Sequence, residues 1–129
     1  MYDHEAAMLA FVKLAGVSQS RRQLGPRDKF LLLAGVAASR AGCLAVARRC
    51  RELVLAHNPS HLVRRYETLE LALGDGEFQA FLKQLSRFCS YEKAEHHLSQ
   101  LDISPDIPNL STKLSAGEYA LLLLGHSLK

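Results

Sequence analysis

Residues 30–59 read FLLLAGVAASRAGCLAVARRCRELVLAHNP, and the spacing of their small residues indicates the fold to expect. The first nine of these residues, 30–38, are all apolar or small. Gly35, Gly42, Ala47 and Pro59 then punctuate two expected helices, and small side chains let helix backbones approach closely. The pattern predicts a tight helical hairpin whose first helix is apolar on nearly every side and therefore lies at the centre of the molecule.

Further helices are expected on both sides of this hairpin. Before it we expect a helix over 3–15, capped by Asp3, and a polar linker over 16–25. Pro26 suits the first turn of the hairpin's first helix, which should reach Arg40. The remaining helices are expected over 43–57, 60–73, 76–89 and 91–101, and a last, very apolar one over 115–127 follows a Pro-containing linker at 102–114.

Composition supports a helical domain. The chain has 129 residues, of which 48% are hydrophobic and 22% charged, so one domain with a real core is expected. Leu and Ala dominate and β-branched residues are few, which favours helix over strand. We therefore expect an all-α protein of six or seven helices in antiparallel hairpins. Its single domain, 1–129, would comprise a body (1–101), the linker (102–114) and the C-terminal helix (115–127).

The segment 31–59 resembles one tetratricopeptide repeat, a helix–turn–helix unit of about 34 residues. Gly35, Ala47 and Pro59 follow one another at intervals of twelve residues, as in that family, and Gly42 falls at the turn. The segment departs from the family at Leu31 and Ala38, where large aromatics are usual, and at Val54, which replaces Ala. The next unit, 62–91, keeps a Gly turn and Ala80 but lacks the closing proline. The resemblance implies a stacked helical array, and an irregular helical bundle is the alternative.

The chain shows no sign of export or membrane insertion. Its start, MYDHE, is acidic and polar, unlike a secretory leader. The longest apolar run is about half of what a membrane span needs. Cys43 and Cys50 would lie on one helix with their Cα atoms roughly 10 Å apart, too far for a disulfide. With Cys89 they are expected to be buried, reduced thiols in a cytoplasmic protein without a membrane partner.

Charge is strongly segregated along the chain. Residues 21–65 carry ten Lys/Arg and two acids, a net charge of +8, whereas residues 66–129 carry five bases and nine acids, a net of −4. Arginine predominates, and its guanidinium favours forked contacts with carboxylate or phosphate. The candidate binding surface consists of Arg48, Arg49, Arg51, Arg64 and Arg65, and Arg21, Arg22 and Arg27 precede the hairpin. The alternative is internal pairing of these helix faces with Glu52, Glu67 and Glu70.

Candidates for catalysis or metal binding are few. His57 and His61 would share one face of a continuous helix, but Pro59 predicts that the helix stops between them. The densest titratable cluster is expected to be a solvated helix face, because the chain lacks the Glu-x-x-His of carboxylate-bridged metal bundles; it comprises Glu92, Glu95, His96 and His97. No nucleophile elbow, phosphate loop or dinucleotide motif occurs. We therefore assign no catalytic residues, metal ligands or cofactors.

A second resemblance concerns residues 114–122, LSAGEYALL, which look like the helix opening of winged-helix response-regulator DNA-binding domains. A capping box, Ser115 to Glu118, before a buried helix accounts for the same residues.

These patterns favour a non-enzymatic protein–protein interaction or scaffold module. It would bind a protein partner, of acidic character if the arginines form one face, and would self-associate through its Leu-rich terminal helix. An Arg-mediated nucleic-acid-binding protein is the alternative, weakened because no aromatic residue lies between the arginines for base stacking. A metal-dependent helical-bundle enzyme is the third possibility.

Overall fold

In the computed structural model, residues 3–103 and 115–125 are described, and all regular structure among them is helical. The model therefore confirms the all-α class. The helices are α1 (His4–Ser20), α2 (Leu24–Ala41), α3 (Leu44–His57), the 3₁₀ helix η1 (Leu62–Arg65), α4 (Leu69–Ala72), α5 (Gly76–Phe88), α6 (Tyr91–Gln100) and α7 (Ala116–Leu123). No helix of the described residues is long and apolar enough to cross a membrane.

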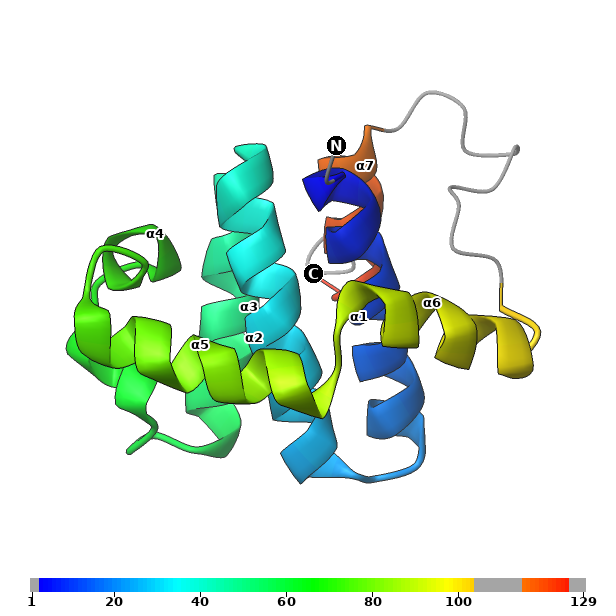
Figure 1. Ribbon diagram of the computed structural model, residues 1–129, viewed down its shortest axis with the longest axis horizontal. Helices are drawn as coiled ribbons and strands as arrows, with labels where there is room; N and C mark the ends of the chain where they lie inside the picture. Colours follow the sequence, from blue (N-terminus) through cyan, green and yellow to red (C-terminus); the bar gives the residue numbers. More distant parts are fainter. Residues whose placement is uncertain (1–2, 104–114, 126–129) are drawn as a thin grey trace.

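Three helices, α1, α2 and α3, stand side by side, and the others pack around them (Figure 1). In this view α5 and α6 run across the front of the three, with α5 against α2 and α6 against α1. The terminal helix α7 lies behind α1 and contacts both α1 and α3. The short helix α4 packs on α2 and α3.

The central position expected for the hairpin's first helix is confirmed. Residues 31–38 of α2 are all buried, and α2 contacts α1, α3, α4 and α5. Its only buried charged residue is Asp28, near its start. Because α2 is enclosed on several sides, its sequence does not need the amphipathic stripe of a surface helix.

Gly35 allows α2 and α3 to approach closely, as its position predicts. A Cβ atom built on Gly35 would lie 2.3 Å from Cδ1 of Leu69 and 3.2 Å from Cβ of Cys50, so a side chain has no room there. Ala47 is buried on the facing side of α3. Gly42 ends α2 in the left-handed conformation, with φ of 83°, which glycine adopts without strain.

Side chains that precede the helices cap the starts of α1, α5, α6 and α7. Asp3 accepts a hydrogen bond from the Ala6 amide, and Asp75 and Ser90 cap α5 and α6 in the same manner. At α7 both bonds of the capping box are present, between Ser115 and Glu118. These bonds satisfy backbone donors that a helix start would otherwise leave unpaired.

The prediction of a linker over residues 16–25 is wrong. The first helix continues through Gly16 to Ser20, and the turn occupies only residues 21–23 before α2 begins at Leu24. Arg22 adopts a left-handed conformation, with φ of 58°, in the position where a glycine is usual. Gly16 is exposed, so its only cost to the stability of the helix is the low intrinsic helix propensity of glycine.

The prediction of a single helix over residues 60–73 is also wrong. That segment divides into η1 and α4, separated by extended residues at 66–68, of which Tyr66 donates a hydrogen bond to Asp75 over 2.6 Å. Thr68 then caps α4. In the following helix Ala80 is exposed and does not mediate a helix contact. The linker expected over 102–114 and the end of the helix expected over 115–127 lie largely outside the described residues.

Candidate functional site

The candidate arginines do not share one environment. Arg48 and Arg51, on α3, line a small cleft of about 60 Å³ together with Glu67 and Glu70 from the start of α4. No ion pair within 4 Å joins these four side chains in the described part of the chain, but two acids offset the two bases of this cleft. Nε of Arg51 is buried there without a hydrogen-bond partner among those residues.

The other three candidates lie elsewhere. Arg49 forms an ion pair of 3.5 Å with Glu52 along α3. Arg65, at the end of η1, forms an ion pair with Glu77 of α5. Arg64 is exposed and has no ion pair with a described residue. Basic and acidic segments therefore meet within the fold, as the alternative interpretation of the charge pattern expected, and only part of the arginine set is open to a partner.

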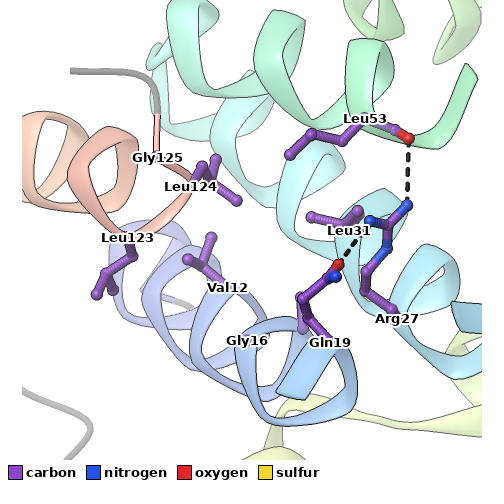
Figure 2. Close-up of a pocket in the computed structure, with 10 residues that line it drawn as sticks. Val12, Gly16, Gln19, Arg27, Leu31, Leu53, Leu123, Leu124 and Gly125 are labelled. Carbon is purple, nitrogen blue, oxygen red and sulfur yellow. Dashed lines mark hydrogen bonds between the residues drawn. The ribbon is translucent and has the colours of Figure 1, made fainter. Parts of the chain in front are cut away.

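The larger cavity lies on another side of the molecule, between α1, α2, α3 and the end of α7 (Figure 2). Its volume is about 380 Å³, within the usual range of small-molecule sites. The walls are apolar except at one end, where Gln19 and Arg27 lie; the other lining residues are Val12, Ala15, Gly16, Leu31, Leu53, Leu123, Leu124 and Gly125.

The cavity exists because α7 covers only part of the groove between α1 and α3. Near its start α7 is tightly packed, since a Cβ on Gly117 would lie 3.2 Å from Sγ of Cys43, the residue that precedes α3 in the chain. On the opposite side Nζ of Lys13 lies 5.5 Å from the ring centre of Tyr119. The helix ends at Leu123, and Gly125 turns the chain with φ of 79°.

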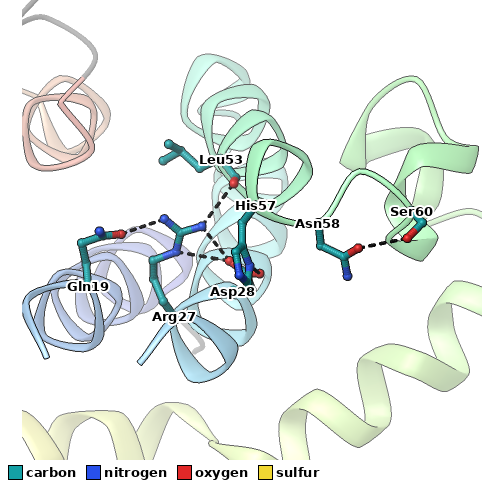
Figure 3. A network of polar contacts seen from close by, with 7 residues as sticks. All are labelled: Gln19, Arg27, Asp28, Leu53, His57, Asn58 and Ser60. Atoms are coloured by element: carbon teal, nitrogen blue, oxygen red, sulfur yellow. Dashed lines mark hydrogen bonds and ion pairs between the residues drawn. The ribbon is translucent and has the colours of Figure 1, made fainter. Parts of the chain in front are cut away.

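A polar network joins three helices beside the cavity (Figure 3). Nε and Nη2 of Arg27 donate to one carboxylate oxygen of Asp28, at 3.2 and 2.8 Å. Nη2 also donates to the Leu53 carbonyl, and Nη1 donates to Gln19 at 2.7 Å. The second Asp28 oxygen is 2.6 Å from Nδ1 of His57, the last residue of α3.

The network holds the guanidinium in one position. The Arg27 and Asp28 side chains are 12% and 11% exposed, so water screens the attraction between their opposite charges only weakly. The Asp28–His57 contact is the kind that orients an imidazole in acid–base sites. Among the described residues, however, no hydroxyl or thiol hydrogen bonds to the other nitrogen of this ring.

The cysteines are not activated nucleophiles. All three are free, and burial raises the pKa of each thiol. At Cys50, which is fully enclosed between α2 and α3, burial raises the pKa to about 12. A thiol must lose its proton to attack or to bind a metal, so these environments oppose both roles.

The structure places the candidate histidines and glutamates where the sequence predicts them. His57 ends α3 and His61 precedes η1, with the chain turning between them. The cluster on α6 is exposed, with Tyr91 donating to Glu95 at 3.0 Å; its members are Glu92, Glu95, His96 and His97. The described residues contain no group of three or more side chains arranged to hold a metal ion.

Sequence reasoning missed the cavity and most of its polar end. It noted Arg27 and His57 but gave no role to Gln19, Asp28 or Leu53. One signal was available: Asp28 is one of only two acids in residues 21–65 and stands at the start of an otherwise apolar helix. A lone acid in such a position must have a charged or polar partner if it is buried.

Comparison of this chain with protein-family models, with curated protein sequences and with solved structures finds no match. Any function must therefore be argued from the geometry described above.

Proposed function

We propose that this chain is a non-enzymatic protein-interaction module that associates with a second copy of itself through α7. The observation that carries the proposal is the pair of adjacent leucines at the end of that helix. Leu122 and Leu123 keep 38% and 43% of their surface exposed. Large apolar side chains that are exposed next to one another are typical of contact surfaces.

The chemistry of α7 suits a second copy as the partner. Its only charged residue is Glu118, which is engaged in the capping box at the other end of the helix. In a two-fold symmetric contact the same surface meets itself, so charges on it would face like charges. An uncharged leucine surface avoids that repulsion, and α7 is already packed on the rest of the molecule through Ala120.

The non-enzymatic part of the proposal is supported by the state of the nucleophiles. The raised pKa values of the cysteine thiols make them poor nucleophiles. A cytoplasmic location is part of the same proposal, and it is supported by three cysteines that remain free.

Two further expectations remain proposals with narrower support. A tetratricopeptide-like character of the α2–α3 hairpin is supported by Gly35 and Ala47, which lie at the helix contact. An acidic partner at the arginines is supported by exposed Arg48 and Arg64, since Arg49 and Arg65 form ion pairs within the chain. No specific feature of the described residues favours nucleic acid.

Sedimentation equilibrium of the full chain tests self-association. We expect the wild type to be a dimer and Leu122→Glu to be a monomer, because the buried contact would then contain two unpaired carboxylates. The matched control is Leu71→Glu on α4, where the leucine is 60% exposed and far from α7 in the chain; it should remain a dimer.

Circular dichroism must show that Leu122→Glu keeps its helix content, and Leu122→Ala provides a milder second variant. A monomeric wild type would overturn the proposal, as would a Leu122→Glu variant that is folded and still dimeric.

A further inference from the structure

The polar side chains that line the 380 Å³ cavity are Gln19 and Arg27, which lie at one end of it (Figure 2). Nη1 of Arg27 has two N–H groups, of which one donates to Gln19 and the other has no partner among the described residues. The side-chain nitrogen of Gln19 donates to no residue in that part of the chain either. A group bound at this end must therefore supply acceptor oxygens.

The donors are fixed in advance of binding. Arg27 is held by Asp28 on one edge and by the Leu53 carbonyl on another, and its side chain is only 12% exposed (Figures 2 and 3). Asp28 lies behind the guanidinium and does not line the cavity. A ligand would thus meet the donor side of the ion pair, and little ordering of the arginine would be needed on binding.

We propose that this cavity binds a straight-chain carboxylic acid. The hydrocarbon chain would lie among Val12, Leu31 and Leu53, and the carboxylate would accept hydrogen bonds from Nη1 of Arg27 and the Gln19 amide. An ionised carboxylate carries acceptors only, which matches two donors without a neighbouring free acceptor.

Other ligand classes fit less well. A phosphate carries three strong acceptor oxygens, more than the two donors at this end can satisfy. A sugar would need polar partners along its whole length, whereas every wall except one end is apolar. A hydrocarbon without a head group would leave the donors at that end without a partner, which costs binding energy when they are desolvated.

Gly16 provides a direct way to close the cavity. It lines the wall on α1, and a Cβ built there meets nothing within 4 Å, so Gly16→Leu places a side chain in open space without distorting α1. Gly25 is the matched control, because it is also helical and also open around its Cβ but does not line the cavity. Gln19→Glu keeps an acceptor for Arg27 and adds a negative charge beside the carboxylate site.

Isothermal titration calorimetry with decanoate and with decan-1-ol tests the proposal on the full chain. We expect saturable decanoate binding to the wild type and to Gly25→Leu, and none to Gly16→Leu. Gln19→Glu should weaken decanoate binding by about tenfold or more and leave decan-1-ol binding unchanged, since only the acid is repelled. Circular dichroism checks that each variant is folded.

The proposal is overturned if the wild type shows no saturable decanoate binding, if Gly16→Leu binds as the wild type does, or if the acid and the alcohol bind equally. The cavity and the proposed contact of α7 share Leu123, whereas Leu122 belongs to the contact and does not line the cavity. Leu122→Glu should therefore bind decanoate normally.

Discussion

Two glycines on neighbouring helices show how differently the two sides of α2 are packed. At Gly35 an added Cβ would lie 2.3 Å from Cδ1 of Leu69 on α4 and 3.2 Å from Cβ of Cys50 on α3, whereas at Gly16 on α1 it would meet nothing within 4 Å. The first position is crowded by side chains of α3 and α4. The second lies at a cavity, beside which Arg27 of α2 donates a hydrogen bond to Gln19 of α1. Glycine therefore occurs at both a crowded and an open helix surface of the fold.

Gly35→Leu should have the largest effect and tests the tight side. The new side chain has no space between α2 and α3, so we expect the free energy of unfolding to fall by about 3 kcal/mol or more. Chemical denaturation followed by circular dichroism measures this change. The same substitution at Gly16 is the matched control and should not destabilise. Equal effects at the two glycines would contradict the difference in packing.

Asp28→Ala tests the polar network that holds Arg27 in place beside the cavity. It leaves the Arg27 guanidinium without its counter-ion and His57 without its partner, and we expect a loss of about 3 kcal/mol in the free energy of unfolding. Asp28→Asn keeps the shape and one acceptor and should cost less. If Asp28→Ala unfolds at the same denaturant concentration as the wild type, the network does not contribute to stability.

Gly16→Ala should have a smaller effect in the opposite direction. Alanine removes the helix penalty of glycine in the middle of α1 and meets no steric barrier, so we expect a gain of about 0.5–1 kcal/mol. Thermal unfolding measures the gain, with Gly35→Ala as the comparison, which should lose stability. A destabilised Gly16→Ala would show that the cavity wall is not open at this point.

The smallest effect concerns the turn after α3, on the tight side. Nδ1 of His61 accepts a hydrogen bond from the Val63 amide at 3.1 Å, and the imidazole ring packs on Phe81. Burial lowers the pKa of His61 below its ordinary value of 6.5, although the charge of Asp28 opposes this shift. The neutral ring is therefore favoured in the folded state, and its contribution is complete above pH 6.5 and lost as the pH falls below that value.

Unfolding midpoints measured above and below pH 6.5 should thus decrease on acidification, and part of the decrease should disappear in His61→Asn. Asparagine keeps an acceptor for the Val63 amide but does not titrate. An identical pH dependence in the two proteins would show that His61 does not contribute.

Much of the helical framework could be predicted because its signals are local. Gly35 and Ala47 predicted a close helix contact, and the caps at Asp3 and Ser115 each lie within three residues of the amides that they bind. Local signals also misled: Gly16 was taken for a linker residue, but an exposed glycine lowers helix stability too little to end a helix that is packed on its other faces.

The cavity and its polar end could not be predicted in the same manner. Arg27 meets Gln19, eight residues away, and the Leu53 carbonyl, twenty-six residues away, so their contact depends on how three helices are rotated about their axes. Sequence spacing shows which residues share a face of one helix but not which faces meet. The break between η1 and α4 was missed for a related reason, since the hydrogen bond from Tyr66 to Asp75 spans two elements.

Two cysteines are buried to different depths, so the rates at which they react with a thiol reagent differ. Cys43 is partly exposed, with its sulfur beside Gly117 of α7, whereas Cys50 lies fully enclosed opposite Gly35. An alkylating reagent in the native buffer would therefore label Cys43 first. It would reach Cys50 only when the hairpin itself separates, and the ratio of the two labelling rates reports how rarely that separation occurs.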